Sequence, residues 1–313
     1  MVEDFTLKLL NDNARSNSGK ILESLIEQAN INNLKEKISE FQNLDIQNMS
    51  TKNLEKAIYE LLSFKLNGGY SLLTVQSEYS LFKPGERFYR VRKLQNSEMP
   101  NNELGTLSAF WNPPRKYIKY HGRLNKPRES LLYTALNPYT AMCETNLKSG
   151  DSFALCVYEA IEPLRFAWIG GKADYDFSGI KSEKAIDFLE TIRHFLINEF
   201  TKSVPKENES LYRTTNIIKE YYCSRFDDGW RYPSIKNNHE DNICFRTKDI
   251  QQKLKFVGAF IATFENTCES DSDNEAVSFK YIIDGADINI FYDMEREETD
   301  IYAEKLFPEF YRE

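Results

Sequence analysis

Two charged residues stand out because their neighbours are apolar. Arg90 lies within the strand-like run Phe88–Val91, and Glu144 follows an apolar triplet at 141–143 on a segment with helical character. An arginine buried in a strand is costly unless an anionic ligand or a structural salt bridge pairs with it. A carboxylate in such surroundings can stabilise a developing positive charge, whereas an exposed carboxylate in a salt bridge is the plain alternative for Glu144.

Positive charge is concentrated in one stretch of an acidic chain. The formal net charge is -8, which disfavours direct binding of nucleic acid. Between Leu104 and Arg128 there is no acidic residue, yet the stretch contains His121 and six cationic residues: Arg115, Lys116, Lys119, Arg123, Lys126 and Arg128. This asymmetry predicts a site for a small anionic ligand, and a solvated surface loop is the alternative.

The chain lacks the sequence motifs of several common binding sites and enzyme classes. The chain has no G-x-x-x-x-G-K-[ST] or G-x-S-x-G motif, and the glycines at 170–171 indicate a turn. The five cysteines form no C-x-x-C pair and the three histidines share no ligand spacing, so we expect reduced thiols and no metal. Without a signal peptide or a long apolar run, we expect a cytoplasmic protein that does not contact membranes.

The elements that would position these residues fall into two regions. Residues 1–80 are predicted to form a small helical module, with apolar stripes at 21–29 and 54–62, Ser50 as a cap and Gly68-Gly69 as a stop. This module could bind a partner, inhibit the rest of the chain, or simply pack against it.

Residues 81–313 are predicted to form the main domain, with a C-terminal hairpin extension. Asn137-Pro138 is a typical helix start, and further helices are expected at 182–200 and up to about Arg225. The predicted strands are 87–92, 131–135, 153–159, 242–246, 256–264, 277–283 and 288–292, with an exposed acidic loop at 265–275. This pattern predicts an α+β fold with a mixed, mostly antiparallel sheet and flanking helices.

Three blocks of the main domain, taken together, resemble the RES domain, a family named after its Arg, Glu and Ser. The blocks are Phe88–Val91, then 122–125 (GRLN) with 132–135 (LYTA) and 141–144 (AMCE), and lastly 228–234 (DGWRYPS) with Asn242 downstream. The resemblance implies a fold like that of ADP-ribosyltransferase toxins. It also implies cleavage of the nicotinamide–ribose bond of NAD, and a role as the toxin of a toxin–antitoxin pair.

The resemblance gives roles to the charged residues. Breaking the bond to nicotinamide creates an oxocarbenium-like ribose, which Glu144 would stabilise. Arg90 and Arg123 would bind the diphosphate of NAD, because guanidinium groups pair with phosphate oxygens, and Arg92 could assist. A surface loop charge is the alternative for Arg123. These roles require Glu144 and Arg90 to line a common site.

The resemblance also gives roles to uncharged residues. Tyr133 would stack on nicotinamide and bond the ribose, with Tyr89 as a weaker candidate on the opposite face of its strand from Arg90. Ser234 and Asn242 would orient the ribose or the carboxylate. The alternatives are a core tyrosine, a turn serine and a strand-capping asparagine.

The sequence leaves the nature of the acceptor open. Water would make the protein an NAD glycohydrolase, inorganic phosphate as co-substrate an NAD phosphorylase, and a protein or nucleic acid an ADP-ribosyltransferase. NAD is the substrate, so no bound cofactor is expected. A catalytically silent nucleotide-binding or interaction module is the alternative from another class. An antitoxin partner and a homo-oligomer are compatible with the resemblance.

Overall fold

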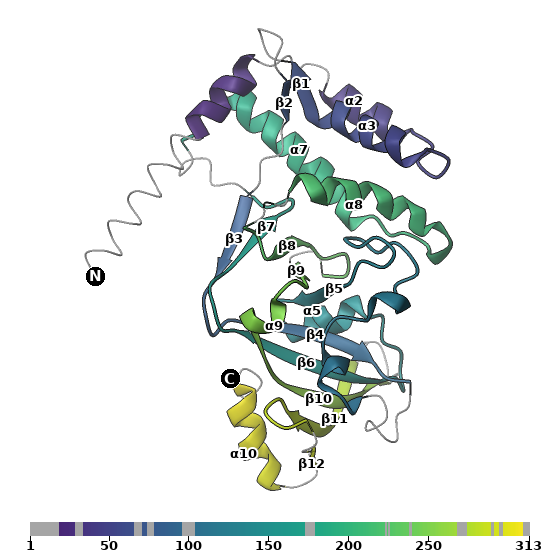
Figure 1. Ribbon diagram of the computed structural model, residues 1–313, viewed down its shortest axis with the longest axis vertical. Helices are drawn as coiled ribbons and strands as arrows, with labels where there is room; N and C mark the ends of the chain where they lie inside the picture. The colour runs from purple at the N-terminus through teal and green to yellow at the C-terminus, as the bar shows by residue number, and fades with distance from the viewer. Residues whose placement is uncertain are drawn as a thin grey trace, which may run out of the picture. The chain divides into compact units, whose positions relative to one another are not determined.

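The computed structural model divides the chain into two compact units (Figure 1). It describes residues 19–308 except 29–33, 66–70, 74–77, 96–103, 173–178, 223, 225, 238–239, 268–273, 289–290 and 294–296. The first unit contains Met1–Tyr79, Tyr120–Lys126 and Ala167–Arg225, and the second contains Ser80–Lys119, Pro127–Phe166 and Phe226–Glu313. The first unit therefore extends beyond the helical module expected at 1–80, because two later segments join it.

The first unit is built mainly from helices. A helix at 19–28 is followed by α2 (Leu34–Gln42), α3 (Thr51–Leu62), the hairpin of β1 (Ser63–Lys65) and β2 (Ser71–Leu73), α7 (Glu183–Thr201), η3 (Lys206–Leu211) and α8 (Tyr212–Tyr221). Ser50 caps α3 as predicted, since its side chain accepts a hydrogen bond from Asn53 N. The helix ends at Leu62, where β1 begins, and Gly68-Gly69 lies outside the described residues.

Apolar faces hold the helices of the first unit together. Leu54 and Ile58 of α3 are fully buried, as their helical spacing predicts. Aromatic pairs join the early and late segments: Phe41 lies 5.8 Å from Phe195 between ring centroids. These contacts between distant parts of the sequence explain why α7 belongs to this unit.

The second unit is an α+β fold around one large, mostly antiparallel sheet. Its elements are β3 (Glu78–Phe82), β4 (Arg87–Lys93), η1 (Leu107–Phe110), η2 (Arg115–Tyr117), β5 (Leu131–Ala135), α5 (Pro138–Glu144), β6 (Ser152–Ala160), β7 (Leu164–Trp168), β8 (Gly229–Pro233), β9 (Asp241–Arg246), α9 (Ile250–Lys253), β10 (Leu254–Thr267), β11 (Asn274–Asp284), β12 (Phe291–Asp293) and α10 (Glu297–Leu306). The sheet order is β12-β11-β10-β6-β4-β5-β9-β8-β7-β3. The predicted α+β class with a mostly antiparallel sheet is confirmed.

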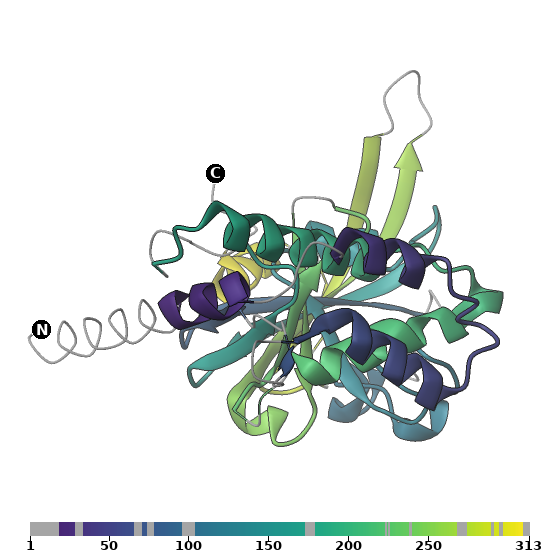
Figure 2. The ribbon, with the colours of Figure 1, turned by 90° about the horizontal axis from the view of Figure 1, so that it is seen from above.

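Most of the predicted strands are present in the structure, but several elements differ from the prediction in their bounds. The prediction of a loop over all of 265–275 is wrong at both ends. Strands β10 and β11 remain paired as far as Thr267 and Asn274, so the connection between them is shorter than predicted. The helix begun by Asn137-Pro138 ends at Glu144, so Leu147 lies beyond it. Strands β3, β7 and β8 were not predicted, because short strands give weak periodicity. Figure 2 shows β10 and β11 as a long pair of arrows projecting from the sheet.

The sheet of the second unit carries an apolar core on each face. One core includes Phe88, Leu132, Ile243 and Phe245. The other includes Tyr89, Ala135 and Leu155, with Ala141 of α5 and Phe307 after α10 packed against them. Because neighbouring residues of a strand point to opposite faces, each strand contributes alternately to the two cores.

The sheet curls around the first of these cores. Strand β3 stands five places from β4 in the strand order, which would separate them by roughly 24 Å in a flat sheet. Phe82 of β3 nevertheless contacts Phe88 of β4, with ring centroids 5.3 Å apart, and Phe166 of β7 lies 4.9 Å from Phe245 of β9. We therefore call the face of Phe88 the inner face of the sheet, and the face of Tyr89 the outer face.

No helix in the described part of the chain has the length and apolar character needed to cross a membrane.

The inner core generates a stability prediction. Phe166 is fully buried and touches the rings of Phe82, Phe88 and Phe245. We expect Phe166→Ala to lower the free energy of unfolding by about 3–5 kcal/mol, because it leaves a cavity between these rings. Leu81→Ala is the control: Leu81 is 66% exposed on β3, and its loss should change stability by less than about 0.5 kcal/mol. Equal effects in urea denaturation would contradict the curled-sheet packing.

Candidate active site

Helix α5 carries Glu144 and is fixed at its start by its own sequence. Asn137 has extended backbone angles and its side chain accepts a hydrogen bond from Thr140 N at 2.7 Å, while Pro138 occupies the first turn. Ala141 faces the outer core of the sheet. The helix is only seven residues long, so Glu144 stands at its last position.

One oxygen of the Glu144 carboxylate is held by three donors. Oε1 accepts hydrogen bonds from Ser234 Oγ at 2.5 Å, from Ile235 N at 3.1 Å and from Asn242 Nδ2 at 2.9 Å. Among the described residues, Oε2 has no hydrogen-bond partner. The carboxylate is thus fixed in orientation through one of its two oxygens.

Ser234 and Asn242 come from the ends of two neighbouring strands. Strands β8 and β9 pair with Tyr232 opposite Asn242, and Ser234 follows the last residue of β8. Both residues are buried, with 1% and 4% of their surface exposed. The structure therefore brings together three of the predicted site residues, Glu144, Ser234 and Asn242, in one hydrogen-bonded cluster.

Tyr89 and Tyr133 share the outer face with this cluster. Asn242 pairs with Ala135, which in turn pairs with Tyr89, and directly opposite residues in antiparallel strands lie on the same face. Tyr133 stands two residues before Ala135 and is therefore on that face as well. It is partly exposed, whereas Tyr89 is 5% exposed in the outer core. Tyr133 is accordingly better placed than Tyr89 to meet a ligand.

The structure does not place Arg90 or Arg92 on the face of Glu144. Both alternate with Tyr89 along β4 and so belong to the inner face. Arg90 pairs with Cys156, a member of the inner core. The expectation that Arg90 and Glu144 line a common site is therefore corrected: strand alternation turns Tyr89, and not Arg90, toward the side of α5.

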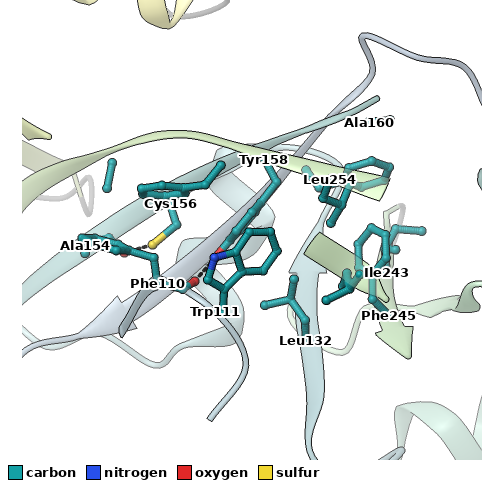
Figure 3. Packing of buried hydrophobic residues seen from close by; sticks show 14 of the residues in the cluster. Phe110, Trp111, Leu132, Ala154, Cys156, Tyr158, Ala160, Ile243, Phe245 and Leu254 are labelled. Carbon is teal, nitrogen blue, oxygen red and sulfur yellow. Dashed lines mark hydrogen bonds between the residues drawn. The ribbon is translucent and has the colours of Figure 1, made fainter. Parts of the chain in front are cut away.

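The guanidinium groups on the inner face hold the segment around η1. Arg90 Nη1 donates to the carbonyl of Phe110 at 3.3 Å, and Arg92 Nη1 donates to that of Ala109 at 2.6 Å. The Tyr158 hydroxyl donates to the same Phe110 carbonyl. Figure 3 shows Trp111 beside Tyr158, with ring centroids 5.3 Å apart.

Burial dominates the titration of the groups near Arg90. It raises the pKa of Tyr158 well above the ordinary value, and the positive charge of Arg90 opposes this shift only in part. Burial also raises the pKa of the Cys156 thiol. Both groups therefore stay protonated at neutral pH, and Cys156 is not an activated nucleophile.

Arg123 belongs to the first unit and has partners of its own there. Its guanidinium donates to the carbonyl of Phe200 and, at 2.9 Å, to that of Lys202, at the end of α7. A cation at this point satisfies carbonyls that lack partners within the helix and matches the helix dipole. Arg123 is 8% exposed, so neither the predicted diphosphate contact nor a surface loop charge describes its position.

The other five cationic residues of the basic stretch, namely Arg115, Lys116, Lys119, Lys126 and Arg128, are exposed. Lys126 pairs with Glu220 at 3.4 Å. This agrees with a solvated surface, because all five side chains are exposed and Lys126 already has an anionic partner.

Arg246 is a charged residue on the outer face that is not among the predicted site residues. It alternates with Asn242 and Cys244 along β9, and its guanidinium carbon lies 5.4 Å from the centroid of the Trp230 ring. The guanidinium is held in orientation by this stacking, and its Nη1 donates to the carbonyl of Asp227 at 3.5 Å. Alternation within the predicted strand 242–246 places Arg246 and Asn242 on one face, but the proximity of Trp230 and Tyr133 depends on the pairing of β5, β8 and β9.

Within the described residues, no group of three or more His, Cys, Asp or Glu side chains is arranged to hold a metal ion.

The placement of Arg90 leads to a prediction about stability. Arg90→Ala removes a charged donor from a buried carbonyl, so we expect the free energy of unfolding to fall by about 1–2 kcal/mol. Arg115→Ala, at an exposed position of the same unit, is the matched control and should have little effect. Equal stability of Arg90→Ala and the wild-type chain would contradict this structural role of Arg90.

Comparison of this chain with known protein families, with curated proteins and with solved structures finds no match.

Proposed function

We propose that the protein is an NAD glycosidase that breaks the bond between nicotinamide and ribose, with Glu144 as the catalytic carboxylate. The observation that carries this proposal is the unequal hydrogen bonding of the two Glu144 oxygens. Three donors hold Oε1, and Oε2 has no hydrogen-bond partner among the described residues. We further propose that the sheet of the second unit is of the ADP-ribosyltransferase-like type, as the resemblance to the RES domain implies.

The chemistry needs one well-oriented carboxylate. The C–N bond breaks with its electron pair going to nicotinamide, which leaves as a neutral pyridine, so no general acid is required. The ribose becomes an oxocarbenium-like cation, and the negative charge of Glu144 stabilises it. Water then adds to the ribose and releases one proton, giving ADP-ribose, or phosphate adds and gives the phosphorylated sugar.

Preorganisation is the reason why the hydrogen bonds to Oε1 favour catalysis over a purely structural role. A carboxylate that is already oriented need not reorganise when the cation forms, and this is the main source of electrostatic catalysis. Tyr133 lies on the same face, where its ring can stack on nicotinamide. In the cell the reaction would drain NAD, which fits the proposed role of a growth-arresting toxin.

Arg246 is the guanidinium that we assign to the diphosphate of NAD. It lies four residues from Asn242 along β9, roughly 13 Å for an antiparallel strand, and on the same face. An extended dinucleotide whose nicotinamide ribose meets Glu144 would run along β9 toward this side chain. Arg90 and Arg92 are on the inner face and are not part of this proposal.

Glu144→Gln tests the catalytic role. The amide keeps the size of the side chain but loses its charge, so we expect the rate of nicotinamide release to fall by about 10²–10³-fold. NAD affinity should change little, because the interaction develops mainly in the transition state. Nicotinamide and ADP-ribose are measured with the purified protein, with and without phosphate, and growth arrest on expression should be lost in parallel.

Glu240→Gln is the matched control, because the Glu240 carbonyl accepts from Ser234 N and, among the described residues, no hydrogen bond joins its side chain to Glu144. It should retain full activity. Wild-type turnover by Glu144→Gln would refute the proposed mechanism, and labelled protein or nucleic acid in place of free ADP-ribose would identify a transferase.

Arg246→Ala tests the assignment of the diphosphate. The loss of a charge-assisted contact should raise KM for NAD by roughly tenfold or more while kcat changes less. Lys248→Ala, which removes one positive charge from an exposed position two residues away, should leave KM unchanged. An unchanged KM for Arg246→Ala would show that another group binds the diphosphate.

A further inference from the structure

The turn Ser234–Asn237 is fixed by hydrogen bonds to a single hydroxyl. Ser234 Oγ accepts from Lys236 N at 3.2 Å and from Asn237 N at 3.0 Å while it donates to Glu144. The ends of the segment are tied as well, since Ser234 N donates to the Glu240 carbonyl at 2.9 Å and Glu240 N donates to that of Asn237 at 3.0 Å. The turn is therefore a rigid base for the donors that face Glu144.

A second connection joins this turn to α5 independently of the carboxylate. Asn237 Nδ2 donates to Thr140 Oγ1 at 3.0 Å. Thr140 is fully buried and lies four residues before Glu144, so both side chains are on the same side of the helix. The turn thus holds α5 at two points one helical turn apart, and this fixes the rotation of the helix as well as its position.

We propose that Asn237 is a positioning residue, which through Thr140 sets the rotation of α5 so that Glu144 presents Oε2 to the substrate. This inference rests on the proposed function. Without the Asn237–Thr140 bond, three donors still hold Oε1 and Ala141 still packs on the outer core, but the rotation of α5 is fixed less tightly. The charge of Glu144 is then displaced from the ribose, and turnover falls while NAD binding stays.

A positioning role for Asn237 predicts a loss of kcat, which a residue that only stabilises the turn would not cause. A displacement on the order of 1 Å can reduce turnover by up to about a hundredfold, so we expect Asn237→Ala to lower kcat by roughly tenfold with KM nearly unchanged. Thr140→Val removes the acceptor but keeps the shape of the buried side chain, and should lower kcat equally. Thr140→Ser retains the hydroxyl and should restore most of the activity.

The experiment is a double-mutant cycle on kcat, measured by nicotinamide release from NAD by the full-length chain. If Asn237 and Thr140 act through one bond, the double variant Asn237→Ala, Thr140→Val is no slower than either single variant. Lys236→Ala is the control, since Lys236 is exposed and contributes only its backbone N–H to the turn. Thermal unfolding of each variant verifies that the fold is retained.

The outcomes separate this inference from the proposed function. Full kcat in Asn237→Ala or Thr140→Val, or multiplied losses in the double variant, would overturn the positioning role while Glu144-dependent turnover still supports the glycosidase. If the wild-type protein releases no nicotinamide, both proposals fail together.

Discussion

The hydrogen bonding of one carboxylate oxygen organises the outer face of the sheet. Glu144 sits at the last position of a short helix, and its Oε1 accepts from Ser234, Ile235 and Asn242. These donors come from β9 and from the turn after β8, so the position of the carboxylate depends on the pairing of the two strands. Leaving buried donors such as Ser234 and Asn242 unpaired would be costly, which explains why the cluster closes around the carboxylate.

Strand alternation decides which other residues can act with Glu144. The outer face of the sheet carries Tyr133 and Arg246 together with the Glu144 cluster, whereas Arg90 and Arg92 stabilise the segment around η1 on the inner face. The sheet is curled, so the inner face encloses a dense aromatic core. A guanidinium there serves to satisfy buried carbonyls.

Local signals in the sequence predicted local structure well. The Asn137-Pro138 pair marked the start of α5, Ser50 marked that of α3, and the run 131–135 is β5 to the residue. The alternation along β4 also indicated that Tyr89 and Arg90 point in opposite directions. Which of them faces Glu144 could not be derived, because it depends on the strand order β4-β5-β9, which is fixed by contacts between distant segments. For the same reason the basic stretch gave no sign that the carbonyls at the end of α7 would engage Arg123.

We propose that Glu144 faces the ribose of NAD through Oε2, which has no hydrogen-bond partner among the described residues. A crystal structure of Glu144→Gln with NAD tests this most directly, because the slowed variant should retain the intact dinucleotide. We predict that the nicotinamide ribose lies within hydrogen-bond distance of the residue 144 side chain, with the dinucleotide extending along β9 toward Arg246. NAD bound on the inner face, or anywhere away from residue 144, would contradict the account.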